Sequence, residues 1–179
     1  MATEAFNREQ LGELRGFVRG FARLQQALTI GLYNYDVLLL PVTESVEATL
    51  QEHFDALGQK LKPPVKHWEI RLDKLSPWQQ TFEKALRSWL LSDDELKTFY
   101  EQKRAHDPRP GEVHVGTNDV ARAFREELES FLGGGKHTVW EVTLHALTGA
   151  SDRYLATLDD HFVFELDGAV LLVTFAMTR

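Results

Sequence analysis

The segment 137–177 places the strongest constraint on the fold, because its apolar residues alternate with polar ones and it contains a two-residue turn signal. Asp167-Gly168 separates the apolar runs 162–166 and 169–177, and this dipeptide between such runs is typical of a tight β-hairpin. A turn at these residues predicts three cross-strand pairs on one face: Leu166 with Ala169, Phe164 with Leu171 and Phe162 with Val173.

The opposite face of this hairpin is too apolar for a surface that faces water. It carries Val163, Val170 and Leu172 beside His161, Glu165 and Thr174. We therefore expect the last strand to lie inside the sheet, or its second face to be covered by a helix or a partner.

The rest of the segment also follows the two-residue period of a strand. Trp140, Val142 and Leu144 alternate with polar neighbours, which predicts a half-buried strand. We expect turns at residues 148–152 and at Asp159-Asp160, with a strand over 153–158 between them. Together these elements predict a β-meander of about four strands over residues 137–177.

Residues 7–132 are predicted to be mainly helical. Apolar residues at helical spacing predict one long helix from Asn7 to Leu40, or a helix followed by a short strand over 35–40. Four more helices are predicted from their capping residues: one from Thr43 to Gly58, one from the Ser76-Pro77 N-cap, one from Ser92, and one from Thr117 or Asn118 to the glycines at 133–135. Alternation around Trp68 predicts a strand over 65–72 that could join the sheet.

These elements predict an α+β fold in which about five helices pack on a mainly antiparallel C-terminal sheet. A length of 179 residues suits one domain over the whole chain, 1–179. Hydrophobic residues make up 43% of the chain and charged residues 26%, which is typical of a globular protein with a real core.

Net charge and cysteine content exclude several classes of function. The formal charge of −7 argues against a protein that neutralises many phosphates, so we expect no nucleic-acid partner. The absence of cysteine excludes disulfides and thiolate chemistry, which favours a cytoplasmic protein. The first seven residues lack the layout of a signal peptide and no apolar run is long enough for a bilayer, so no membrane partner is expected.

Histidines and glutamates supply one hypothesis for an enzyme. Glu141 and His145 on one strand, with His161 and Glu165 on a neighbouring one, could form a catalytic face, in an enzyme such as a metal-dependent hydrolase. The alternative is that these are ordinary polar residues on the exposed half of a meander. No His-Glu-x-x-His or other metal-ligand spacing occurs, so we predict no metal and no cofactor.

A second group of candidates lies in the Pro- and Gly-containing segment 106–116. His106, Asp107 and His114 stand there, where a scaffold often displays binding residues, although solvated loop residues are the simpler explanation.

Arginines and glycines mark two sides of the first predicted helix. Arg8, Arg15, Arg19 and Arg23 form a basic stripe along one side of this helix. The stripe could bind an anionic partner, or it could be solvated or pair internally with acids of the second helix. Glycines at 12, 16 and 20 form a row away from the apolar face; this row either lets another helix approach closely or is merely tolerated.

The function that these features favour is a non-catalytic protein-binding module, of the bacterial immunity or inhibitor kind, that masks a partner. An acidic surface speeds encounter with a basic target, and no catalytic motif competes with this interpretation. The partner could be another protein or a second copy of the chain, and the small enzyme described above is the alternative.

Overall fold

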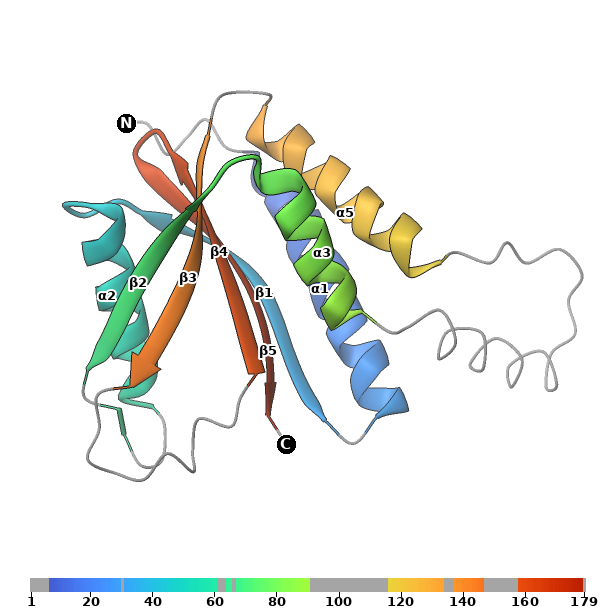
Figure 1. Cartoon of the computed structure of the whole chain (residues 1–179), viewed down its shortest axis with the longest axis horizontal. Helices are drawn as coiled ribbons and strands as arrows, with labels where there is room; N and C mark the ends of the chain where they lie inside the picture. Colours follow the sequence, from blue (N-terminus) through green and yellow to red (C-terminus); the bar gives the residue numbers. More distant parts are fainter. Residues whose placement is uncertain are drawn as a thin grey trace, which may run out of the picture.

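The computed structural model describes residues 7–29, 31–60, 64–65, 67–90, 116–133, 137–146 and 158–178. Within these ranges the chain forms four helices and one five-stranded antiparallel sheet, which confirms the α+β class (Figure 1). The helices are α1 (Arg8–Leu28), α2 (Val46–Gly58), α3 (Trp78–Trp89) and α5 (Thr117–Leu132). The strands are β1 (Leu32–Pro41), β2 (Trp68–Leu75), β3 (Thr138–Ala146), β4 (Leu158–Leu166) and β5 (Ala169–Thr178).

The sheet has the order β1-β5-β4-β3-β2, and every neighbouring pair is antiparallel. Its two edge strands come from the region that was predicted to be mainly helical, so a C-terminal meander of about four strands is an incomplete description. The predicted strand around Trp68 does join the sheet, but it begins three residues later than expected. The helix predicted from Ser92 lies outside the described residues.

The β4–β5 hairpin confirms the predicted turn and register. Gly168 has a φ of 74°, a conformation that favours glycine, and Leu166 pairs with Ala169 across the turn. Phe164 pairs with Leu171, as predicted. Both explanations offered for the apolar second face are correct, since β5 lies between β1 and β4 and α2 covers that face.

Strand β1 confirms the second of the two predictions for residues 7–40, a helix followed by a strand. Helix α1 ends at Leu28, and the strand is longer than predicted because it already begins at Leu32. Tyr35 and Val37 belong to the core on one face of the sheet, whereas Leu38 and Leu40 pack on the other. Burial on both faces removes the alternation that would identify a strand.

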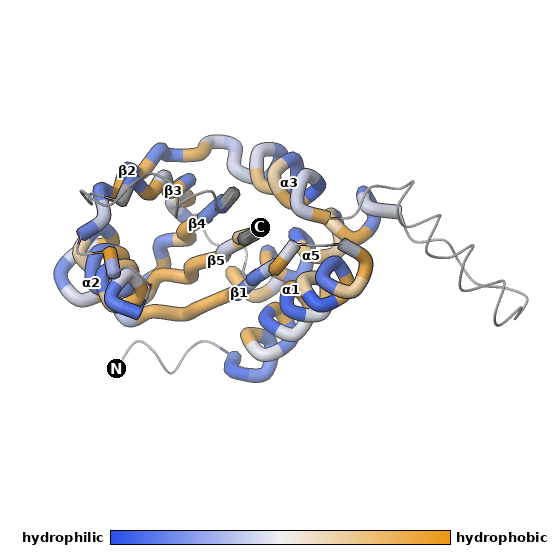
Figure 2. Tube along the Cα trace, turned by 90° about the horizontal axis from the view of Figure 1, so that it is seen from below, coloured by the Kyte–Doolittle hydropathy of each residue, from blue (hydrophilic) through white to orange (hydrophobic). Residues whose placement is uncertain are grey.

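Two cores lie on opposite faces of the sheet. The larger one is enclosed by α1, α3 and α5, and we call it the three-helix core; the smaller one lies beneath α2. Figure 2 shows the mostly hydrophobic strands β1 and β5 between α2 on one side and the other three helices on the opposite side. The chain thus has three layers, with the sheet in the middle.

Phe82 of α3 is the centre of the aromatic packing in the three-helix core. Its fully buried ring contacts Phe162 of β4 at a centroid distance of 5.1 Å and Phe124 of α5 at 6.0 Å. It also contacts Phe164 and Phe175 of the sheet. One side chain of α3 therefore packs against α5 and against the two strands β4 and β5.

Three predicted N-caps are wrong, each by one or two residues. The cap of α2 is Ser45, whose hydroxyl accepts a hydrogen bond from Ala48 N at 3.1 Å, while Thr43 donates its own N–H to Thr49. The helix α3 begins after Pro77 because that residue is extended (ψ 142°), and α5 begins after an extended Gly116. The predicted end of α5 is confirmed, since Gly133 is left-handed at φ 72°.

The turn predicted at Asp159-Asp160 is wrong, because both residues lie within β4. Each carboxylate has a partner there: Asp160 accepts a hydrogen bond from the Trp89 indole at 2.5 Å, and Asp159 contacts His161 at 3.3 Å. These bonds compensate for placing two acids in a strand. The strand predicted over 153–158 lies outside the described residues except for Leu158, the first residue of β4.

Candidate functional site

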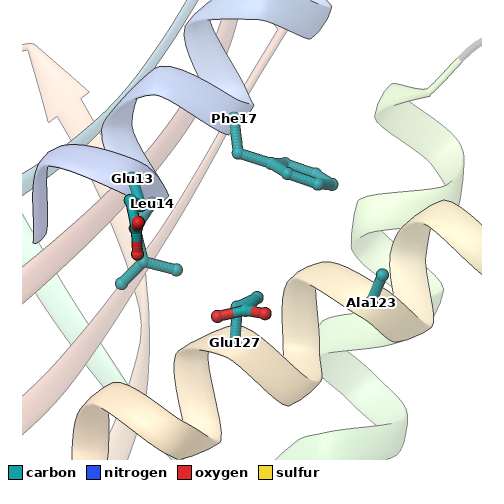
Figure 3. Close-up of a pocket in the computed structure, with 5 residues that line it drawn as sticks. All are labelled: Glu13, Leu14, Phe17, Ala123 and Glu127. Carbon is teal, nitrogen blue, oxygen red and sulfur yellow. The ribbon is translucent and has the colours of Figure 1, made fainter. Parts of the chain in front are cut away.

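A pocket of about 330 Å³ lies between α1 and α5 (Figure 3). Helix α1 contributes Glu13, Leu14 and Phe17, and α5 contributes Ala123 and Glu127. In each helix the spacing of four residues puts the acid and its apolar neighbour on one side, Glu13 with Phe17 and Ala123 with Glu127. The pocket therefore has an apolar floor and one carboxylate on each wall.

The floor of this α1–α5 pocket is fixed by the three-helix core. Leu14 is 3% exposed, and the Phe17 ring stacks on Phe124 of α5 at a centroid distance of 5.3 Å. In Figure 3 the Phe17 ring and the Glu127 carboxylate both project into the space between the helices. Because these side chains are already held in place, little conformational entropy is lost when a ligand binds.

The two carboxylates of the pocket are not neutralised by any residue that the structure describes. Both Glu13 and Glu127 are exposed, and neither forms an ion pair in these ranges. On α5, Arg125 is held by Glu83, Glu126 and Glu129, and Arg122 is paired with Asp119. The hydrogen bond to Glu83 raises the pKa of Arg125. The pocket is left anionic.

The predicted basic stripe lies on the other side of α1, beside β1. Arg15 Nε donates to Asp36 Oδ1 at 3.2 Å, and Arg19 Nη2 donates to Asp36 Oδ2 at 2.7 Å. Internal pairing is therefore confirmed for these two arginines, but the acid comes from β1 and not from the second helix. Arg19 and Arg23 line a further open pocket of about 300 Å³ with Tyr33 and Asn34.

The predicted His/Glu face is not assembled as one site. In the β3–β4 ladder Glu141 stands opposite Phe162 and Val142 opposite His161. Residues on adjacent positions of a strand point to opposite faces, so Glu141 and His145 lie on the side of the three-helix core, whereas His161 and Glu165 lie on the α2 side. The expectation that the four residues share a face is wrong.

His161 instead belongs to a polar chain beneath α2. Its side chain is 5% exposed, with Nδ1 at 3.0 Å from Thr174 Oγ1 and Nε2 at 3.3 Å from Asp159 Oδ2. The ring of Phe54 packs edge-on at 5.2 Å. Both ring nitrogens have partners, as expected of a buried histidine that stabilises the fold.

His53 on α2 makes this region sensitive to acid. Burial lowers the pKa of His53, and the charges of His161 and Lys60 lower it further, against an opposing effect of Asp36. The unfolded chain takes up a proton at His53 near the ordinary pKa of about 6.5, whereas the folded chain does so only at lower pH. The contribution of neutral His53 to stability is therefore fully present above the unfolded pKa of about 6.5, and it is lost as the pH falls through the lower pKa of the folded chain.

We therefore expect a smaller loss of stability on acidification when His53 is replaced. Urea denaturation at about pH 7.5 and about pH 5 measures this loss for the wild type and for His53→Gln. His145→Gln, which changes an exposed histidine on β3, is the control. An identical loss of stability on acidification in the wild type and in His53→Gln would contradict the coupling between the protonation of His53 and folding.

Comparison of the chain with protein-family models, with curated proteins and with solved structures finds no match in any of the three.

His106, Asp107 and His114 lie outside the described residues. Over the ranges that are described, no group of three His, Asp or Glu side chains is placed to hold a metal ion. None of the helices in those ranges is both long enough and apolar enough to cross a membrane.

The acidic pocket was missed from the sequence, although part of its signal was visible. Neither Glu13 nor Glu127 was among the predicted site residues. Pairing Glu13 with Phe17, and Ala123 with Glu127, at helical spacing would have identified an acid beside a small or aromatic residue on each helix. That α1 lies against α5 could not be read from that spacing.

Proposed function

We propose that this chain is a non-catalytic binding module that recognises a basic protein and receives one arginine or lysine side chain in the α1–α5 pocket. The observation that carries this proposal is the pair of unneutralised carboxylates, Glu13 and Glu127, above an apolar floor. The module would act as an inhibitor or immunity-type protein does, by covering a surface of its partner.

The chemistry of the pocket suits a long cationic side chain. Arginine and lysine carry an aliphatic stem that packs on apolar surface and a charged head that needs a polar partner. Leu14 and Ala123 supply contacts for the stem, and the face of Phe17 attracts a cation. The carboxylates of Glu13 and Glu127 then accept hydrogen bonds from the head.

The charge of the whole chain supports the same kind of partner. A formal charge of −7 steers a basic protein towards the surface and raises its rate of association. The rival enzyme hypothesis is weakened, because Glu141 and His145 are separated by the sheet from His161 and Glu165. His161 is in addition too deeply buried to touch a substrate.

A peptide array tests the proposal directly. The peptides carry arginine, lysine, citrulline or norleucine at the centre of random flanking residues, and citrulline is the neutral counterpart of arginine. We expect the wild type to prefer the arginine and lysine peptides. The double variant Glu13→Gln/Glu127→Gln should bind them about ten-fold or more weakly, which corresponds to about 1.4 kcal/mol.

The matched control is Glu47→Gln/Glu52→Gln, which removes two exposed charges from α2 and leaves the pocket intact. It should retain the preference of the wild type. Equal binding of arginine and citrulline peptides by the wild type, or an equal loss in both double variants, would refute a specific role of the pocket.

A further inference from the structure

The second pocket introduced above, of about 300 Å³, lies between α1 and β1. Its lining is mostly polar and consists of Arg19, Ala22, Arg23, Gln26, Tyr33, Asn34 and Tyr35. Arg19 and Arg23 are one helical turn apart, so both guanidinium groups come from the same side of α1. The α1–β1 pocket therefore combines two cations with amide and hydroxyl groups.

The charges around this pocket do not cancel. Asp36 accepts one hydrogen bond from Arg15 and one from Arg19, so a single carboxylate is shared by two arginines. Arg23 is exposed, and no carboxylate pairs with it in the part of the chain that the structure describes. Three cations and one anion leave a local charge of +2, on a chain whose formal charge is −7.

The walls of the pocket are held in place by contacts already formed. Gln26 Nε2 donates to the carbonyl oxygen of Tyr33 at 2.7 Å, which ties α1 to β1. The Tyr33 ring packs edge-on against the buried ring of Tyr35 at 5.9 Å. Asn34, which also lines the pocket, is exposed. The lining therefore includes the aromatic side chain of Tyr33, held against Tyr35, in addition to the two arginines.

We propose that the α1–β1 pocket binds a phosphomonoester dianion. A local charge of +2 matches a doubly charged group better than a monocarboxylate. The planar guanidinium of Arg23 is free to form two parallel hydrogen bonds to phosphate oxygens. The volume exceeds that of phosphate alone, so the ester group has room against Tyr33.

This site is separate from the pocket that carries the proposed function. On α1, at about 100° per residue, Gly12, Gly16 and Gly20 lie between the arginine side and the side of Glu13. Substitutions in one pocket therefore leave the other untouched, and failure of either proposal has no bearing on the other.

Titration calorimetry at constant ionic strength tests the phosphate site with four probes: phenyl phosphate, inorganic phosphate, benzoate and chloride. We expect saturable binding of phenyl phosphate, weaker binding of inorganic phosphate, and little binding of benzoate or chloride. Arg23→Gln should weaken the binding of phenyl phosphate by about ten-fold or more. Arg23→Lys should weaken this binding by less, because the charge remains while the bidentate geometry is lost.

Arg23 is the residue to change because its side chain is exposed and makes no ion pair that the fold depends on, unlike Arg19. The control is Arg8→Gln, which removes an exposed arginine from the first turn of α1 and should leave binding unchanged. Three results would overturn the proposal: no saturable binding of either phosphate, benzoate bound as tightly as phenyl phosphate, or equal loss in Arg23→Gln and Arg8→Gln.

Discussion

Replacement of Phe82 by alanine is expected to lower the free energy of unfolding by about 4 kcal/mol, as measured by urea denaturation. The Phe82 side chain is 0% exposed, so the variant loses the burial of a whole ring and leaves a cavity. The neighbouring rings of Phe124 on α5 and of Phe162 and Phe164 on β4 are themselves packed on other residues. They cannot all move inward to fill the space, so the cost should lie in the upper part of the usual range.

The control for this prediction is Leu57→Ala on α2. Leu57 is 41% exposed and belongs to neither core, so its replacement should cost less than about 1 kcal/mol. If Phe82→Ala were no more destabilising than Leu57→Ala, the aromatic cluster of the three-helix core would not exist in solution as described.

The β4–β5 hairpin could be predicted because local signals were sufficient for it. Asp167-Gly168 set the turn, the turn set the register, and the alternation from Phe162 onwards set which residues face the core. By contrast, β1 could be predicted only as an alternative, because Leu38 and Leu40 are packed by α2 on one face while Val37 is buried on the other. A segment buried on both faces has no period to detect.

The candidate sites depend on contacts between distant segments, which sequence spacing cannot supply. The arginine stripe was visible from the helical period, but its partner Asp36 was not, because this pairing requires β1 to lie beside α1. The four residues of the His/Glu face were misplaced for a related reason. No turn signal fixes the register of β3 against β4, and a shift of β3 by one residue moves Glu141 and His145 to the other face relative to His161.

The triple variant Gly12→Ala/Gly16→Ala/Gly20→Ala is expected to raise the free energy of unfolding by about 3 kcal/mol, close to 1 kcal/mol for each helical glycine. A Cβ atom at each of these positions meets nothing within 4 Å among the described residues, so no clash opposes the gain in helix propensity. The row is thus tolerated in the folded chain, and no described helix packs against it. Urea denaturation of the triple variant measures the gain.

Gly58 is the matched control, since the same substitution at the end of α2 should have the opposite sign. A Cβ atom there would lie 2.7 Å from the carbonyl oxygen of Val65 and 2.8 Å from the indole nitrogen of Trp68. The first of these is backbone, so the segment that leads into β2 would have to shift, at a cost of about 1–3 kcal/mol. Gly58 does not have the left-handed conformation that Gly133 and Gly168 adopt; glycine is required at this position because the chain passes so close to it. If Gly58→Ala were stabilising, the packing of α2 on β2 would be contradicted. If the triple variant were destabilising, the exposure of the glycine row would be contradicted.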